Sequence, residues 1–388
     1  MRDAPLFRFI ADRADELSAI SIDTAPPAPF VHADPYLLAS AVQKAIRRGD
    51  LTIARRAAHQ LYALDRQRLW RRLAVVGLED LGIADIDVAA ELIAISTLTA
   101  ARRLLGGDIP ALDIALTRAC AAAKDRTGDH LASIISREPL DNMDRVAIRT
   151  ASPTALLAML ASADLSWTRR LHAAVIASGR SDTVQLVAPN IGAVFDVLRE
   201  LGAPALLITT CQAYAARQRD ALPILVPFAA VLAATRCTGA PPRDPKIVSH
   251  DLPPVEMISG WPSYVFDPNW TRIGRRATEL WLRSYMMKQP WLPRQVAAAL
   301  WNAESALCDR TFDWHMSDEL RQRAHRADLL ARGLPAQHHA ELHAWITRER
   351  PVLTAARQAA FDSAVRQSAK IAESNFQTYP PQQVPLFK

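Results

Sequence analysis

Aromatic and basic side chains alternate in a proline-rich stretch and at the start of the helix expected to follow it. These residues are Trp261, Tyr264, Phe266, Asp267, Trp270, Thr271, Arg272, Arg275 and Arg276. Aromatic rings stack on exposed bases, guanidinium groups hold phosphates, and the free amides at a helix N-terminus also favour anions. The pattern therefore predicts a nucleic-acid-binding cleft formed by this loop and helix.

The same residues also fit a purely structural interpretation. Aromatic side chains in a segment without a core of its own anchor that segment to a helical body. Asp267 or Thr271 would then cap the helix that follows, because both residue types accept hydrogen bonds from free N-terminal amides. The sequence leaves the two interpretations open.

Carboxylates in this region could support chemistry on a base. Enzymes that excise or modify bases place a carboxylate, alone or with a positioned water, beside the pocket that holds the base. Asp267 is the leading candidate, and Glu304 and Asp309 are the next. Glu304 lies among apolar neighbours, where burial would raise its pKa. The alternative role for Glu304 is a buried ion pair with an arginine.

Metal and cofactor motifs are missing from the sequence. His338, His339 and His343 form a histidine cluster without the spacing of a zinc protease, so we expect surface or partly packed histidines. The four cysteines are far apart and include no CxxC pair. There is no glycine-rich dinucleotide loop, nucleophile elbow or GxxxxGK[ST] phosphate loop. We therefore expect no metal, no cofactor and no ATPase activity.

Composition indicates a helical, basic protein. Half of the 388 residues are apolar, glycine is scarce and alternating β-branched runs are almost absent, which favours an all-α fold. The formal charge of +6 and the pI near 9.3 come mainly from arginine, which suits bidentate phosphate contacts. Arginines spread over solvated helix faces would give the same charge. No secretory or membrane-spanning stretch is evident, so we expect a soluble cytoplasmic protein.

Residues 38–129 carry a series of short motifs. Residues 41–50 read AVQKAIRRGD, residues 69–73 read LWRRL, residues 79–82 read EDLG and residues 119–124 read ACAAAK. The series resembles the C-terminal helical collar of the RarA (MgsA/WRNIP) ATPases, clamp-loader relatives that act at stalled replication forks. The resemblance ends at residues 125–129, which read DRTGD. It implies a module that forms homo-oligomers at replicating DNA, where phosphates or a protein partner would meet Arg47, Arg48, Arg71 and Arg72.

The chain ends in a proline-rich tail, residues 377–388. Gln383, Val384, Leu386 and Phe387 resemble the peptide with which bacterial replication and repair proteins bind the sliding clamp, although Pro385 replaces its usual small polar residue. An extended proline-rich segment loses little entropy on binding, which suits such a peptide. The alternative is that the Leu-Phe pair folds back onto the protein's own core.

Hydrophobic periodicity and helix-breaking residues predict a multi-helix bundle or an array of helical hairpins. Helices are expected over residues 35–48, 52–64, 66–78, 89–104, 112–124, 153–163, 166–178, 191–201, 205–220, 223–235, 272–287, 293–308, 317–331, 335–348 and 352–376. One long irregular loop is expected over residues 237–271. We expect an N-terminal strap or linker (1–33), a collar-like domain (34–131), a helical layer (132–236), a loop plus helical domain with the candidate cleft (237–376) and the tail.

The favoured hypothesis is a DNA-binding protein of replication, repair or genome defence without ATPase activity. The competing hypothesis is a DNA-processing enzyme, a base-excising glycosylase or a nuclease, acting on DNA that includes modified phage DNA. Asp267 or Glu304 would then stand at the reacting centre. A third hypothesis is a structural oligomerisation module. DNA and, through the tail, the sliding clamp are the expected partners, and no membrane partner is expected.

Overall fold

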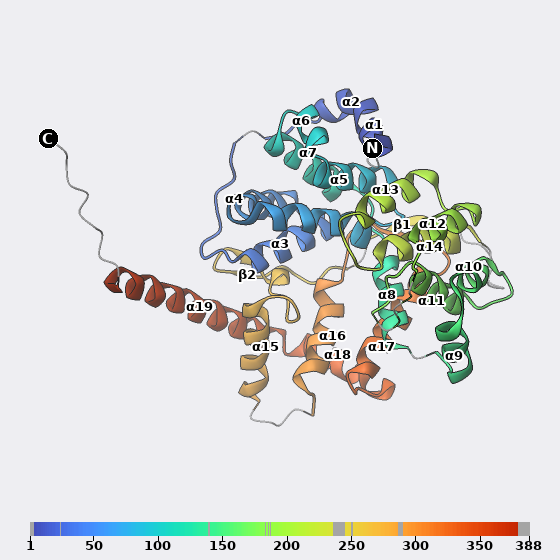
Figure 1. Cartoon of the computed structure of the whole chain (residues 1–388). Coiled ribbons are helices and arrows are strands. Elements are labelled where there is room, and N and C mark those ends of the chain that lie inside the picture. The colour runs from blue at the N-terminus through green and yellow to red at the C-terminus, as the bar shows by residue number, and fades with distance from the viewer. Residues whose placement is uncertain are drawn as a thin grey trace.

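The computed structural model describes residues 4–23, 25–138, 140–182, 184, 186, 188–235, 245–249, 251–285 and 290–378. For residue 4 and residues 369–378 it describes the backbone alone. The described residues form an all-α, multi-helix fold, as the composition predicts, with four very short strands in the last third (Figure 1). None of the helices in these ranges is both long enough and apolar enough to cross a membrane.

Seven helices make up the N-terminal group, and a π-helical turn, η1, follows the longest of them. In chain order they are α1 (Ala4–Asp12), α2 (Ala14–Ser18), α3 (Pro35–Arg47), α4 (Leu51–Val76), η1 (Gly77–Leu81), α5 (Ile86–Thr97), α6 (Thr99–Leu104) and α7 (Asp108–Ala121). Helices α3 and α4 pack along each other, and α5 packs against both α4 and α7. This group contains most of the collar-like motifs.

Short-range signals bound α3 and start α4 where the sequence predicts. The Asp34 carboxylate accepts a hydrogen bond from an amide in the first turn of α3, and Pro35 occupies the first helical position, where its missing N–H is not needed. Gly49 ends the turn between the helices with φ of +69°, a conformation open to glycine at no steric penalty. Asp50 caps α4 through its carboxylate.

Two of the expected helix boundaries differ in the structure. The helices expected over residues 52–64 and 66–78 are joined in α4, which kinks at Asp65 (φ −152°, ψ 79°). The Asp65 carboxylate accepts a hydrogen bond from the amide of Arg68 at 2.9 Å and so caps the second half. In contrast, the helix expected over residues 89–104 is divided at Leu98 into α5 and α6.

The middle group consists of seven helices. They are α8 (Thr127–Arg137), α9 (Asn142–Thr150), α10 (Pro153–Ala161), α11 (Trp167–Ala177), α12 (Ile191–Glu200), α13 (Ala205–Ala215) and α14 (Leu222–Ala234). No helix was expected over the residues of α8 and α9, where proline, glycine and charged residues weaken the apolar periodicity. Helix α8 packs against α14 on one side and against the C-terminal group on the other.

The C-terminal group contains five helices and the short strands. Its elements are β1 (Lys246–Val248), β2 (Met257–Ile258), β3 (Trp261–Pro262), η2 (Ser263–Val265), α15 (Arg272–Ser284), α16 (Pro293–Leu300), η3 (Trp301–Ser305), β4 (Thr311–Asp313), α17 (Ser317–Ala331), η4 (Ala336–His338), α18 (His339–Arg348) and α19 (Arg350–Thr378). Of these, η3 is a second π-helical turn. Helix α15 packs on α19, and α17 packs on α8. Helix α19 extends away from the body of the molecule (Figure 1).

The stretch expected to be irregular contains regular structure in its described part. Strands β1 and β4 pair antiparallel, with Lys246 opposite Asp313 and Val248 opposite Thr311. Strands β2 and β3 form a second antiparallel pair next to each other in the chain. Both pairs attach the segment to the helical body, which explains how a proline-rich stretch keeps a defined course. Strands this short are invisible to periodicity in the sequence.

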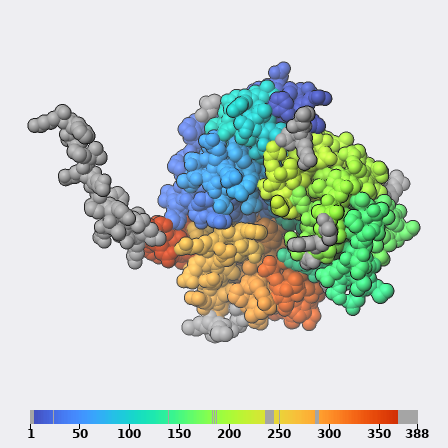
Figure 2. All heavy atoms as spheres, in the orientation of Figure 1, coloured from blue at the N-terminus to red at the C-terminus, as the bar shows by residue number. Residues whose placement is uncertain are grey.

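One continuous hydrophobic core crosses the boundaries of the domains expected from the sequence. It includes Leu6, Ile10 and Leu17 of the N-terminal helices, all fully buried, and Phe361 of α19. Residues 1–33 were expected to be a strap or linker, but α1 packs on α5, α6 and α13 and contributes to the core. A smaller cluster lies between α15, α16, α18 and α19. Figure 2 shows the three groups packed against one another over one face of the molecule.

Candidate nucleic-acid-binding cleft

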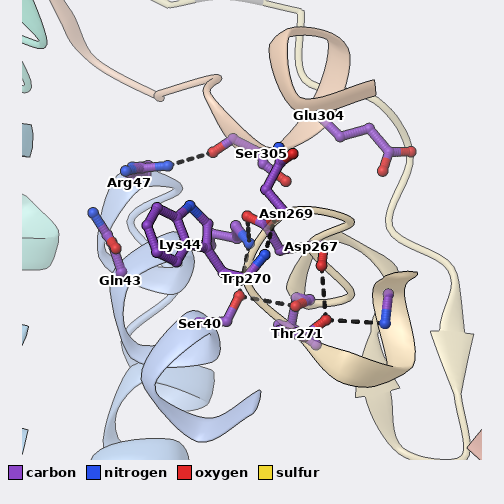
Figure 3. Close-up of polar contacts among 12 residues, drawn as sticks. Ser40, Gln43, Lys44, Arg47, Asp267, Asn269, Trp270, Thr271, Glu304 and Ser305 are labelled. Carbon is purple, nitrogen blue, oxygen red and sulfur yellow. Dashed lines mark hydrogen bonds and ion pairs between the residues drawn. The ribbon is translucent and has the colours of Figure 1, made fainter. Parts of the chain in front are cut away.

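Asp267 lies in the turn before α15 and is 1% exposed. One carboxylate oxygen, Oδ2, is 2.6 Å from Nζ of Lys44 on α3 (Figure 3). The other, Oδ1, accepts hydrogen bonds from the amides of Asn269 and Trp270 at 2.7 and 3.1 Å. Both oxygens are therefore occupied by groups of the protein. This geometry favours a structural role, in which Asp267 fixes the turn that carries Trp270.

Lys44 is the buried partner of this carboxylate. Burial lowers its pKa to about 8, and the adjacent Asp267 opposes the shift by attraction. Its ammonium group also donates to the hydroxyl of Ser40 at 2.6 Å, and that hydroxyl donates to the carbonyl oxygen of Val265 at 2.9 Å. The chain of contacts ties α3 to the loop before α15.

Glu304 is the second candidate carboxylate and forms a buried ion pair. It is 3% exposed, and its oxygens lie 2.5 Å from Nη2 of Arg357 and 3.2 Å from Nη1 of Arg350. Burial would raise the pKa of Glu304, but the attraction of Arg357 and its neighbours is stronger in sum and holds it below the usual value. Glu304 thus joins η3 to α19, which is the alternative role that the sequence left open.

The loop aromatics divide into two kinds. Trp261 is fully buried, stacks on Phe30 with ring centroids 3.9 Å apart and donates from Nε1 to the carbonyl oxygen of Val31. Tyr264 is also buried and donates from its hydroxyl to Asp50 at 3.1 Å. These two rings anchor the loop to the body. Trp270 differs, because 66% of it is exposed to solvent.

The candidate arginines also divide into buried and exposed side chains. Arg47 is fully buried, which does not fit a direct contact with phosphate or with a partner. Arg48 is partly buried over the ring of Tyr264, and Arg72 donates to Gln43 at 3.0 Å. The arginines exposed to solvent are Arg71 on α4 and Arg272, Arg275 and Arg276 on α15.

Arg47 joins the two π-helical turns instead of facing solvent. Its guanidinium donates to Glu79 at 2.7 Å and to Asp80 at 2.5 Å, both on η1, and to the carbonyl oxygen of Ser305 on η3 at 2.6 Å (Figure 3). Burial raises the pKa of Glu79 to about 7, and the adjacent Asp80 adds to the shift. Single π-helical turns are frequent at functional sites, and here two of them meet at one arginine.

Arg126 extends this network toward the surface. Its Nη2 is 2.6 Å from Oδ2 of Asp129, and its Nη1 donates to the carbonyl oxygen of Ala306 at 3.2 Å. The ring of Trp301 on η3 has three cations around it, with Lys44, Arg47 and Arg126 at 5.3 to 5.6 Å from the ring centroid. Cations at this range attract the ring, so Trp301 is held in place.

A cleft of about 190 Å³ opens beside Trp301. Trp270 and Asn269 line it from the turn before α15, and Trp301 and Asn302 line it from η3. The remaining lining residues come from two helices that pack together. From the start of α8 these are Arg126, Asp129, His130, Ser133 and Arg137, and from α17 they are Arg321, Ala324, His325, Asp328 and Arg332.

The charges of the cleft are mixed, with arginine in excess. Four arginines line it against two aspartates. Asp129 is paired with Arg126, which holds its pKa below the usual value although burial acts the other way. Asp328 is paired with both Arg137 and Arg332 at 3.0 Å. Arg126 is also paired with Glu79 and Asp80, and Arg321 with Asp318, so an anionic ligand would compete with these carboxylates for the guanidinium groups.

Two histidines of the cleft are neutral at physiological pH. Burial lowers the pKa of His130 to about 3, and repulsion from Arg126 adds to the shift. Burial likewise lowers the pKa of His325 to about 3, and the nearby His343 contributes. Nε2 of His325 lies 2.8 Å from Nε2 of His343, as expected for a hydrogen bond between neutral rings. His339 contacts the carbonyl oxygen of Leu334, so the predicted histidine cluster is partly packed.

The residues of α8 and α17 were missed by the reasoning from sequence. A signal for them exists, because both sets recur at i, i+3, i+4, i+7 and i+11, which places each on one helix face. Each face begins with an arginine, has a histidine four residues later and ends with another arginine. Repeated polar spacing of this kind on two helices would have pointed to a shared polar surface.

The described part of the chain contains no group of three or more histidine, cysteine, aspartate or glutamate side chains placed to hold a metal ion. The predicted tail residues Gln383, Val384, Leu386 and Phe387 lie outside the described residues. The collar-like motifs form α3 to α7, and the divergent residues 125–129 form the start of the cleft helix α8. Compared with protein-family models, curated proteins and solved structures, the chain matches none.

Proposed function

We propose that this protein binds DNA in the cleft between α8 and α17 and over the adjoining start of α15. The observation that supports this most is Trp270, a large aromatic residue that is 66% exposed at the rim of an arginine-lined cleft. A single exposed apolar side chain is common, but Trp270 stands beside a cleft that a ligand could enter. Base stacking uses such a ring, and guanidinium groups hold the phosphates beside it.

The neighbouring surface extends the basic character of the cleft. Arg272, Arg275 and Arg276 are exposed in the first turns of α15, directly after Trp270. Arg275 donates to the carbonyl oxygen of Asn269 at 3.2 Å, which keeps its guanidinium close to the turn. A backbone with regularly spaced phosphates would meet arginines on α15 and then those of the cleft. The net charge of +6 favours the approach of such a polyanion.

Binding is a better account of these residues than base excision. Asp267 and Glu304 are buried in ion pairs, and the carboxylates that do line the cleft, Asp129 and Asp328, are each paired with arginine. A general base or a nucleophile needs a carboxylate free to reach the reacting atom. We therefore place this protein among DNA-binding proteins of replication, repair or genome defence, with no step of catalysis assigned.

Fluorescence anisotropy with a short labelled oligonucleotide tests the proposal. The logarithm of the affinity should fall linearly with the logarithm of the salt concentration, as counterions are released from the phosphates. Arg321→Ala or Arg275→Ala should weaken binding and reduce that slope by about one. Trp270→Ala should weaken binding by about 5- to 150-fold, the effect of about 1 to 3 kcal/mol of stacking.

The matched controls lie on α6, away from the cleft (Figure 1). Arg103→Ala removes the same charge from an exposed position, and Leu104→Ala truncates an exposed apolar side chain. Both should bind DNA like the wild type. Absence of binding even at low salt would overturn the proposal, and so would equal losses in the control and cleft variants.

A further inference from the structure

Two buried imidazole nitrogen atoms of the cleft residues have no hydrogen-bond partner within the described residues. They are Nδ1 of His130 on α8 and Nδ1 of His325 on α17. A buried polar atom without a partner destabilises a protein, because it has lost its hydrogen bonds to water. Both atoms belong to residues that line the same cleft. A ligand in the cleft, or an ordered water, would supply the missing hydrogen bonds.

The two imidazoles are suited to a neutral ligand group. Each ring is uncharged at neutral pH, so its Nδ1 can act either as an N–H donor or as an acceptor, while Nε2 of His325 is already bonded to His343. Phosphate oxygens only accept hydrogen bonds, and the guanidinium groups of the cleft are suited to donate to them. The edge of a nucleobase carries donors and acceptors side by side, which a neutral imidazole can match.

Flat aromatic surfaces stand in the same cleft. Trp301 is held by cations around its ring, and Trp270 lies at the rim. Trp270 and Asn269 come from the same turn, whose amides are held by Asp267 (Figure 3). Tryptophan is the side chain that offers the largest surface for stacking on a base, whatever the sequence. The arrangement combines stacking surfaces with hydrogen-bonding groups at one place.

The space available matches a nucleotide better than a phosphate alone. A second pocket of about 250 Å³ adjoins the cleft, and Arg126, His130 and Arg321 line both. Together they reach the size of small-molecule sites, which is about 300 to 1,000 Å³. The second pocket also has apolar walls, which include Phe312 and Leu307. A base with its sugar can enter this space, and the phosphates can remain near the arginines.

We infer that the cleft receives one unpaired nucleotide, with its base directed toward His130 and His325 and its phosphate held by the exposed Arg321. This inference rests on the proposed DNA-binding function and specifies its substrate as single-stranded DNA or an extrahelical base. Bases in a duplex are stacked and paired, and taking one out of the stack opposes binding by a few kcal/mol. The cleft therefore selects unpaired strands.

Three DNA ligands of equal length separate the contributions on the full-length wild-type chain, and the duplex carries twice the phosphate charge of the other two. They are a single strand, the matching duplex, and a single strand of base-free deoxyribose phosphates. The single strand should bind about tenfold or more tighter than both of the others, since stacking and base contacts require an accessible base. Equal binding of the single strand and the base-free strand would overturn the inference and leave DNA binding intact. Failure of all three to bind would overturn the proposed function itself.

Two variants locate the base contact. His130→Leu and His325→Leu keep the size of the side chain and remove its hydrogen-bonding atoms, so each should weaken binding of the single strand by about 5-fold or more. Their affinity for the base-free strand should stay at the wild-type value, a result that a misfolded variant cannot give. His172→Leu, at a partly buried histidine on α11 outside the cleft, is the control and should change neither affinity. Parallel losses for both strands would contradict a base contact.

Discussion

Lys44 Nζ and Asp267 Oδ2 lie 2.6 Å apart, although the two residues are 223 positions apart in the sequence. The contact joins α3 of the N-terminal group to the turn before α15, and both side chains are almost completely buried. Because the same carboxylate also holds the amides of Asn269 and Trp270, the ion pair determines where Trp270 stands. A structural contact in the core thus positions the exposed ring of the candidate site.

Asp267→Asn should destabilise the protein by about 3 to 5 kcal/mol, because it leaves the buried ammonium group of Lys44 without its counter-charge. Urea denaturation followed by circular dichroism measures the change. Asp87→Asn, which removes an exposed carboxylate paired with Arg13, should change stability by less than about 1 kcal/mol. If Asp267→Asn instead kept full stability and abolished strand cleavage or base release, the catalytic hypothesis for Asp267 would be supported.

Glu304 and Arg357 should show strong coupling in a double-mutant cycle. Glu304→Leu or Arg357→Leu alone leaves one buried charge unpaired, with an expected loss of about 3 to 5 kcal/mol. The double variant leaves neither charge of the pair and should lose clearly less than the sum of the two single losses. Unfolding free energies of the four proteins provide the cycle. Additive losses would mean that the pair does not act as a unit between η3 and α19.

Gly274→Ala should destabilise the protein, although alanine is favoured over glycine in a helix by about 1 kcal/mol. A Cβ atom on Gly274 would lie 2.3 Å from the carbonyl oxygen of Asp267, so the turn before α15 would have to move. Gly192→Ala is the control on α12, where the nearest atom is the end of the Asn190 side chain at 3.3 Å. Thermal unfolding should show a lower Tm for the first variant and little change for the second. A raised Tm for Gly274→Ala would show that this turn tolerates displacement.

Glu79→Gln should change how stability depends on pH. The pKa of Glu79 is raised in the fold from 4.5 to about 7, so the folded protein binds this proton more tightly than the unfolded chain. The stabilising contribution is complete below pH 4.5 and is lost as the pH rises through 7, a loss of up to about 3 kcal/mol. The glutamine of Glu79→Gln does not titrate, so the variant is not destabilised in this way. Its free energy of unfolding relative to that of the wild type should therefore rise between pH 4.5 and 7. Glu341→Gln, at an exposed position, should run parallel to the wild type.

The tail prediction depends on sequence alone. Deletion of residues 383–388 should abolish co-purification with the bacterial sliding clamp, because Gln383, Val384, Leu386 and Phe387 are the residues that resemble its binding peptide. Affinity for DNA should stay unchanged, since the cleft lies elsewhere in the chain. A pull-down with purified clamp measures the first outcome, and unchanged recovery of the clamp would contradict the predicted contact.

Local features of the structure were accessible from the sequence. The all-α fold follows from composition and helical periodicity, and the boundaries at Asp34, Gly49 and Asp50 follow from capping and turn residues. Thr271 caps α15 by accepting the amide of Gly274 at 3.0 Å, as its position predicts. These features depend on hydrogen bonds within a few residues, so nearby sequence contains the information that specifies them.

The roles of individual charged residues were decided by the tertiary structure alone. Arg47 and Arg275 look alike in sequence, but Arg47 is enclosed by η1 and η3, whereas Arg275 faces solvent at the start of α15. The cleft arises because α8 packs on α17, and neither helix has a complete polar site by itself. The residues that bury or pair a given charged side chain lie far from it in the sequence. The sequence by itself determined the helical fold class, most of the helices and the chemistry that the arginines and aromatics offer, and only the packing decided which of these side chains remain free to bind.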